Sequence, residues 1–96
     1  MYAASKHAVE GFMKSVAVEL APRGIRAVSI APTWVHTEMS AAKLADPVFR
    51  AEVERQIPLG RILEAKEIAD LVVFLCSPAA GMITGSSLRV DGGLTS

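Results

Sequence analysis

The sequence predicts an α/β fold in which helices pack on a parallel sheet. Short segments rich in β-branched residues alternate with longer segments whose apolar residues recur every three or four positions, as on one face of a helix. The order is helix, strand, long loop, helix, strand. A strand–helix–strand unit of this length normally forms a parallel crossover. We therefore expect two parallel strands flanked by helices.

The first predicted helix covers residues 2–21. Its apolar residues recur at steps of three and four and form one face: Val9, Phe12, Met13, Val16 and Leu20. Alanines on the same segment have small side chains, which favour close packing of the helix against a sheet or another helix. Pro22-Arg23-Gly24 is expected to end the helix.

Two strands are predicted on either side of a long connection. Ile25–Ala31 is short and β-branched-rich, as expected for a largely buried parallel strand, and Pro32 is expected to end its pairing. Ser86–Val90 alternates apolar and polar residues before the turn Asp91-Gly92-Gly93. We expect these strands to pair with each other.

The connection contains a loop and a second helix. Residues 33–62 carry scattered charges and prolines, so we expect one or two short helices there and a role as a lid or binding loop. The second helix begins at Glu64 and ends at Ser77-Pro78. Its apolar stripe consists of Ile68, Leu71, Val72 and Leu75. Cys76 closes this helix and is expected to be a buried small hydrophobe.

The composition excludes several classes of protein. The 96 residues include ten Lys and Arg and ten Asp and Glu, so no basic field attracts nucleic acid or anionic lipid. One cysteine forms no internal disulfide, and no signal peptide or membrane-spanning segment is predicted. We therefore expect a cytoplasmic protein with no nucleic-acid or membrane partner. The apolar fraction of 51% is high for so short a chain.

Two parallel strands do not make a stable sheet by themselves. A parallel sheet needs both faces covered and its edges paired or shielded. Further strands are required on the free side of Ile25–Ala31, and the sequence opens inside a helix with no strand before it. The high apolar fraction agrees with this deficit, so we expect this chain to be part of a larger sheet.

Tyr2 and Lys6 stand four residues apart at the start of the first helix. This spacing puts them on one helix face with Cβ atoms about 5–6 Å apart. A nearby ammonium group favours the phenolate form and lowers a tyrosine pKa from about 10, which makes the phenol a usable general acid/base. The alternative is an ordinary solvated helix face, on which Tyr and Lys are common.

Four stretches of the sequence stand in a recognisable order. Tyr2-Ala3-Ala4-Ser5-Lys6 opens an Ala-rich helix. The second stretch is Arg23–Pro32, a strand that runs into a Pro-containing loop, and the third is Thr37, which follows Val35 after that proline. The fourth is Ile83-Thr84-Gly85, which leads to Val90-Asp91-Gly92-Gly93 and is preceded by Glu67-Ile68-Ala69. Together they resemble the short-chain dehydrogenase/reductase family. The resemblance implies that residues 1–96 are the C-terminal part of one doubly wound, Rossmann-like domain.

The resemblance implies an NAD(P)-dependent oxidoreductase that interconverts a secondary alcohol and a ketone. Tyr2 matches the family's proton donor and acceptor. Lys6 matches the residue that lowers the pKa of this tyrosine and hydrogen-bonds the nicotinamide ribose. The substrate is a small alcohol or ketone, and the sequence does not distinguish NAD from NADP.

The resemblance also assigns a cofactor loop. Pro32, Val35 and Thr37 match the segment along the nicotinamide end of the cofactor, where a backbone group of Val35 holds the carboxamide and the Thr37 hydroxyl adds a polar contact. Thr33 stands where the family most often has Gly, which makes a close backbone approach less assured at this position.

Residues 38–60 match the family's substrate loop. Four apolar residues in or beside it are candidates for lining a substrate pocket: Trp34, Met39, Leu44 and Phe49. The alternative is that these side chains anchor the loop to the body of the domain. His7 and His36 have no third ligand at metal-like spacing, so no metal site is predicted.

Several family features are absent from this sequence. The Gly-rich phosphate turn, the residue that selects NAD or NADP and the catalytic Ser upstream of Tyr have no counterpart here. Met1 is therefore expected to be either the initiator of a truncated product or the point where a longer sequence was cut. We expect the 96-residue chain by itself to be inactive.

The full-length form of this protein is expected to be a homo-oligomer, either a dimer or a tetramer. The family forms subunit interfaces through its counterparts of the Tyr2–Ala21 helix and of the C-terminal helix–strand unit, and the 91–93 turn fits a subunit contact. An alternative function is a non-catalytic piece that caps oligomers of an intact relative through these surfaces. A freestanding binding domain is disfavoured by the unpaired strand edge.

Overall fold

The computed structural model describes the backbone of residues 2–95 and the side chains of Ser5 and of residues 7–95. Four helices and four strands follow one another, with short 3₁₀ turns at Ala21–Arg23 and Pro78–Ala80. The elements are α1 (Tyr2–Leu20), β1 (Ser29–Pro32), β2 (Val35–His36), α2 (Glu38–Leu44), α3 (Pro47–Gln56), β3 (Leu63–Glu64), α4 (Ala65–Leu75) and β4 (Ser87–Val90). Helices and parallel strands together confirm the predicted α/β class.

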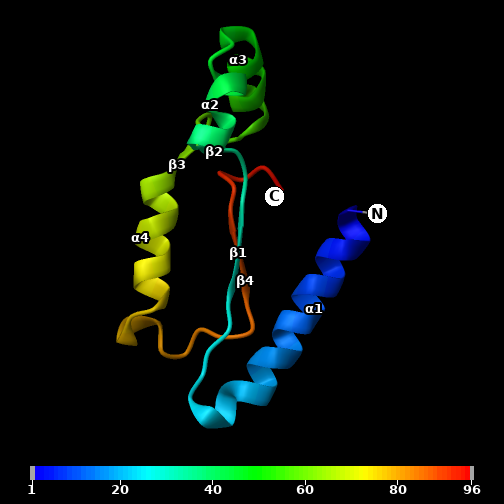
Figure 1. Ribbon diagram of the computed structural model, residues 1–96, viewed down its shortest axis with the longest axis vertical. Coiled ribbons are helices and arrows are strands. Elements are labelled where there is room, and N and C mark those ends of the chain that lie inside the picture. The colour runs from blue at the N-terminus through cyan, green and yellow to red at the C-terminus, as the bar shows by residue number, and fades with distance from the viewer. Residues whose placement is uncertain (1, 96) are drawn as a thin grey trace.

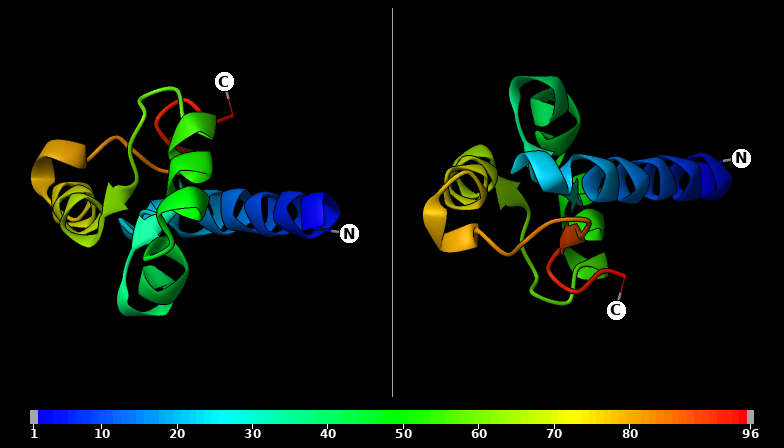
Figure 2. Two further views of the ribbon diagram at one scale, coloured as in Figure 1. Left: turned by 90° about the horizontal axis from the view of Figure 1, so that it is seen from above. Right: turned by 90° about the horizontal axis from the view of Figure 1, so that it is seen from below.

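β1 and β4 pair in parallel, as the sequence predicts. Ser29 lies opposite Ser87 and Pro32 opposite Val90. α1 runs antiparallel to both strands, so its N-terminal end is level with their carboxyl ends (Figure 1). Two perpendicular views show α4 on one side of the strands and α1 extending away on the other (Figures 1 and 2).

The predicted first strand is shorter than expected and half-buried. Pairing with β4 begins at Ser29, whereas Ala27 bonds to the Thr84–Gly85 turn. Pairing ends at Pro32, as predicted, and Pro32 is itself the last paired residue. The N–H groups of Ser29 and Thr33 donate to the carbonyls of Ser86 and Val90. Because backbone groups of successive residues point to opposite sides of a strand, the Pro32 nitrogen faces the free edge. A proline at this position removes no ladder hydrogen bond.

The predicted excursion contains a second parallel ladder that the sequence analysis missed. β2 pairs with β3, with Val35 opposite Leu63 and His36 opposite Glu64. Between them, α2 and α3 fold back on each other beyond the carboxyl ends of β1 and β4 (Figure 1). Asp46 begins α3 by accepting a hydrogen bond from the Val48 N–H at 2.9 Å.

The main cluster of buried side chains lies in this excursion and not on the β1–β4 sheet. Its members are Leu44, Val53, Ile57 and Ile62, with Trp34 and Phe49 packed against them. The Trp34 and Phe49 rings meet edge to face, with centroids 5.5 Å apart. This packing fixes α2 and α3 relative to β2 and β3.

The β1–β4 sheet is only partly covered. α1 lies against this sheet through Glu10, whose carboxylate accepts a hydrogen bond from the Ser87 hydroxyl at 3.3 Å, and through Ala17, which is buried beside Gly85. The Cα radius of gyration is 15.7 Å, whereas a compact chain of this length has about 12 Å. Large apolar side chains remain exposed on α1, among them Val9, Phe12 and Val18. The described chain therefore leaves apolar surface open.

Cys76 is exposed, which corrects the prediction that it is buried. It follows α4 and lines a hollow of about 370 Å³ between α4 and β1. Val72, on the same side of α4, is also 42% exposed. The α4 stripe is apolar as predicted, but in the described chain the side that carries Val72 and Cys76 remains open to solvent.

Candidate functional site

Two candidate segments lie at one end of the molecule. The first turns of α1 carry Tyr2 and Lys6, and the residues that follow β1 carry the predicted cofactor loop. Both are at the level of the carboxyl ends of β1 and β4 (Figure 1). Ligands of parallel α/β sheets bind at this edge. The two candidate segments are therefore level with the edge where such a site is expected.

The side chains of Tyr2 and Lys6 lie outside the described residues. Their backbone is helical, with α1 beginning at Tyr2, so the two residues are separated by one helical turn. Ser5 between them is exposed. The acid/base role of this pair stays a prediction.

The backbone N–H and carbonyl of Val35 point away from β3. The Leu63 N–H donates to the Trp34 carbonyl at 3.1 Å, which directs the Trp34 oxygen toward β3. Because successive backbone groups alternate in direction along a strand, the Val35 N–H and carbonyl face the opposite side. Thr33, Trp34 and Val35 line an open depression of about 400 Å³. A ligand can therefore approach this segment.

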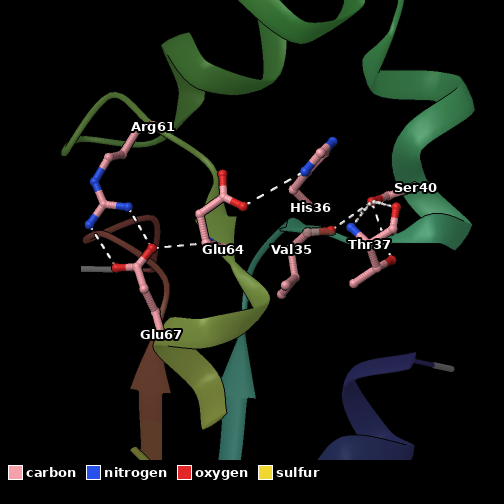
Figure 3. Close-up of polar contacts among 7 residues, drawn as sticks. All are labelled: Val35, His36, Thr37, Ser40, Arg61, Glu64 and Glu67. Atoms are coloured by element: carbon pink, nitrogen blue, oxygen red, sulfur yellow. Dashed lines mark hydrogen bonds and ion pairs between the residues drawn. The ribbon is translucent and has the colours of Figure 1, made fainter. Parts of the chain in front are cut away.

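Ser40 closes the loop that carries Val35 and Thr37. Its hydroxyl donates to the Val35 carbonyl at 2.7 Å and accepts from the Thr37 N–H at 2.9 Å (Figure 3). Thr37 is the N-cap of α2, and Ser40 is the third residue of this helix in a capping-box arrangement. The sequence analysis did not single out Ser40, although Thr37-x-x-Ser40 is a recognisable helix start.

Pro32 and Thr33 connect this segment to the sheet. The Thr33 N–H donates to the Val90 carbonyl at 3.3 Å. No non-glycine residue of the described part has a positive φ. Thr33 therefore stands without backbone strain where the related family most often has Gly.

A charged cluster fixes the strand opposite Val35 and His36. Arg61 donates two hydrogen bonds to the Glu67 carboxylate, at 2.6 and 2.8 Å, and Glu67 also accepts from the Glu64 N–H at 3.0 Å (Figure 3). The Arg61 hydrogen bonds and the Glu64 N–H lower the pKa of Glu67 to about 2. His36 Nδ1 lies 3.7 Å from a Glu64 carboxylate oxygen across the ladder. The sequence analysis placed Glu64 at the start of the second helix and Glu67 in one of the family-like stretches, and it did not single out Arg61.

The four substrate-pocket candidates have different environments. Leu44 is 3% exposed inside the α2–α3 cluster, with Trp34 and Phe49 half-buried against it. Met39 is 95% exposed in the first turn of α2. Met39 is thus the candidate whose side chain is open to a ligand, while the other three stabilise the loop that carries it.

The carboxyl end of β4 leads into a tight turn. The Asp91 carboxylate accepts from the Thr95 hydroxyl at 2.6 Å and from the Gly93 N–H at 3.0 Å, and these contacts lower the pKa of Asp91. The Gly92 carbonyl accepts from the Leu59 N–H at 3.0 Å. The turn thus joins the C-terminal segment to the end of the substrate-loop candidate.

Metal ligands do not cluster in the part of the chain that the structure describes: no group of three or more His, Cys, Asp or Glu is placed to hold an ion. Across the same residues, no helix has both the length and the apolar character needed to cross a membrane.

Comparison with known proteins agrees with the geometry. A family model described as enoyl-(acyl carrier protein) reductase matches residues 1–95. The short-chain dehydrogenase RED2 of Pyricularia oryzae is 45% identical over 95 residues, which cover 98% of this chain and 34% of that protein. The chain thus spans about a third of the length of this curated relative.

Solved structures share the fold. A 4-hydroxyisoleucine dehydrogenase complexed with NADH superposes with a TM-score of 0.89 at 32% identity, covering 98% of this chain and 39% of that one. YwfH, an NADPH-dependent reductase involved in bacilysin biosynthesis, superposes with a TM-score of 0.84 at 27% identity, covering 92% of this chain and 37% of that one. The arrangement of helices and strands is therefore that of part of a Rossmann-like domain.

Proposed function

The chain belongs to the short-chain dehydrogenase/reductase family, and from this we propose that it contributes to an NAD(P)-dependent oxidoreductase that interconverts a secondary alcohol and a ketone. One solved relative is complexed with NADH and another is described as NADPH dependent, so both nucleotides are candidates. The single observation that supports the proposal is that two segments lie level with the same edge of the sheet. These are the Tyr2–Lys6 turn of α1 and the Val35–Thr37 segment after β1.

Each segment has its own task in the proposed reaction. Tyr2 donates a proton to the substrate oxygen in reduction and accepts it in oxidation, and Lys6 favours the phenolate by its positive charge. The bound nicotinamide supplies the hydride chemistry, while the protein supplies binding and orientation. Residues 38–60 form the substrate loop, with Met39 facing the open side of α2.

The residues of the proposed cofactor loop fit a nicotinamide. The Val35 backbone faces away from β3, and Val35 lines an open depression together with Thr33 and Trp34. A carboxamide has both donors and an acceptor, as the backbone of Val35 also has. The Thr37 residue is exposed on the same segment and adds a hydroxyl. Pro32 starts this segment at the last paired position of β1.

A chimera tests the catalytic assignment. This chain replaces the matched segment in the RED2 relative, and NAD(P)H-dependent turnover is measured with and without the Tyr2→Phe substitution. We expect turnover to fall by about 10²–10⁴-fold, the usual contribution of a general acid/base, with cofactor binding nearly intact. A near-normal rate in the Tyr2→Phe chimera would overturn the assignment. Lys14→Ala, a change at an exposed position of the same helix, is the control.

By itself, the 96-residue chain is proposed to lack dehydrogenase activity. It spans about a third of the length of its curated relative, and its sequence contains no Gly-rich turn to bind the cofactor pyrophosphate. Nucleotide-dependent turnover by the purified chain would contradict this proposal.

A second candidate function is assembly with another subunit. The exposed side chains of Val9, Phe12 and Val18 on α1, at 64%, 72% and 77%, favour burial against a partner. The partner would be a second copy or an intact family member, in keeping with a homo-oligomeric enzyme. Size-exclusion chromatography of the chain alone and mixed with an intact relative tests this. Co-elution that Phe12→Ser abolishes supports assembly, whereas aggregation of the chain alone argues against it.

A further inference from the structure

Ser40 makes hydrogen bonds to both residues that are proposed to contact the nicotinamide. We propose that Ser40 is a positioning residue that holds the Val35 carbonyl and the Thr37 backbone in place for the cofactor. The inference rests on the proposed function of the Val35–Thr37 segment. Nothing in the family resemblance assigns a role to Ser40.

The hydroxyl geometry supports this role. A serine hydroxyl has one hydrogen to donate and two lone pairs. Ser40 donates to the Val35 carbonyl at 2.7 Å, which is the usual length for a good O–H···O bond, and accepts from the Thr37 N–H at 2.9 Å. Two further contacts join it to Thr37, at 3.3 Å to the carbonyl and 3.4 Å to the side-chain hydroxyl. One side chain thus fixes the backbone on both sides of His36.

Ser40 leaves capacity for a ligand at Val35. A backbone carbonyl has two lone pairs, and the Ser40 hydroxyl uses one of them. The remaining lone pair stays available to a donor group such as the amide of a carboxamide. Ser40 therefore sets the direction of the carbonyl without occupying it fully.

The position of Ser40 is itself set by packing. Ser40 lies in the first turn of α2, and Leu44 one turn later is 3% exposed in the cluster with Val53 and Ile57. This cluster fixes α2, and α2 fixes the hydroxyl. The same helix carries the exposed Met39 next to Ser40. Ser40 therefore couples the substrate loop to the proposed cofactor loop through one hydroxyl group.

Amide hydrogen exchange in the 96-residue chain tests the contact directly. Ser40→Ala removes the acceptor of the Thr37 N–H, and we expect this amide to exchange about five- to tenfold faster, as for the loss of one hydrogen bond. Ser40→Thr keeps the hydroxyl and should restore slow exchange. Ser77→Ala is the matched control, because its hydroxyl makes a similar bond to the Phe74 carbonyl at 2.6 Å, at the far end of α4. Equal exchange of the Thr37 amide in the Ser40→Ala variant and in the unaltered chain would overturn the inference.

Cofactor kinetics separate positioning from stability. In the RED2 chimera, Ser40→Ala should raise KM for NAD(P)H about five- to tenfold with kcat changed less than about twofold, because one hydrogen bond is lost from the support of the binding segment. Ser40→Thr should restore KM, and Ser77→Ala should leave it unchanged. An unchanged KM in the Ser40→Ala chimera, or an equal rise in the Ser77→Ala chimera, would overturn the inference. Failure of the unaltered chimera to bind NAD(P)H contradicts the proposed function instead, while the exchange experiment still decides whether Ser40 holds the segment.

Discussion

The guanidinium group of Arg61 and the carboxylate of Glu67 form two parallel hydrogen bonds, at 2.6 and 2.8 Å (Figure 3). The same carboxylate accepts the Glu64 N–H, so this pair joins β3 to the first turn of α4. Because β3 is the hydrogen-bonded neighbour of β2, the pair also supports the strand that carries Val35. A contact outside the proposed cofactor loop therefore helps to define its geometry.

The Arg61–Glu67 pair should make the stability of this junction depend on pH. The pKa of Glu67 is lowered from 4.5 to about 2 in the folded chain. A lowered pKa stabilises the folded state fully above the unfolded value, and this stabilisation is lost as the pH falls from 4.5 toward 2. We expect Glu67→Gln to melt at a lower temperature than the unaltered chain at pH 6, and the two melting temperatures to converge near pH 2.

Thermal unfolding followed by circular dichroism measures this difference. Asp70→Asn is the control, since it removes the exposed Lys66–Asp70 pair on α4 without touching β3. A gap between Glu67→Gln and the unaltered chain that stays constant over this pH range would contradict the assignment.

Leu44 and Met39 should separate loop stability from substrate contact. Leu44→Ala removes a buried side chain and should destabilise the α2–α3 unit by about 2–5 kcal/mol, whereas Met39→Ala, at an exposed position, should change stability by less than about 0.5 kcal/mol. Denaturant unfolding measures both. In the chimera, Met39→Ala should alter KM for the alcohol or ketone if Met39 lines the substrate pocket. An unchanged KM for every substrate tested would remove Met39 from the pocket.

Two glycines should respond in opposite directions to alanine. Gly92 has φ of +60°, and a Cβ there would lie 2.6 Å from Cγ2 of the buried Ile57. Gly92→Ala should therefore destabilise the fold by about 2 kcal/mol or more, from left-handed backbone strain and overpacking. Gly11 is helical, and a Cβ added there would meet nothing within 4 Å, so Gly11→Ala should stabilise α1 by up to about 1 kcal/mol. Urea unfolding compares the two; a harmless Gly92→Ala would be inconsistent with the turn geometry.

Lys6 should control the pH profile of the proposed reaction. If its ammonium group favours the Tyr2 phenolate, Lys6→Met should shift the rise of alcohol oxidation to higher pH, toward the ordinary tyrosine pKa of about 10. Steady-state rates of the chimera from pH 6 to about pH 10 measure the shift. Lys14→Met, at an exposed position on the same helix, is the control and should leave the profile unchanged. A lower rate with an unshifted profile would assign Lys6 to binding only.

The spacing of apolar residues in the sequence was sufficient to predict the longer helices and strands. α1, α4 and β4 lie within one or two residues of their predicted ranges, and the pairing of β1 with β4 is parallel as expected. These elements have local signals, because side chains on one face of a helix or strand repeat at a fixed spacing. The Tyr2–Lys6 spacing was equally readable, since one helical turn is a local relationship.

Tertiary structure alone decided the rest. β2 and β3 are two residues each, too short to show a period, and they exist because Val35 and Leu63 meet across the intervening loop and helices of residues 36–62. The exposure of Cys76 depends on whether another element fills the hollow between α4 and β1, which no pattern within that helix records. The Arg61 contact likewise depends on where β3 packs against α4, whereas the Thr37–Ser40 capping box is a local signal that the sequence analysis missed. The sequence by itself therefore determined the local elements and the family, whereas packing between distant segments determined which side chains support the candidate site.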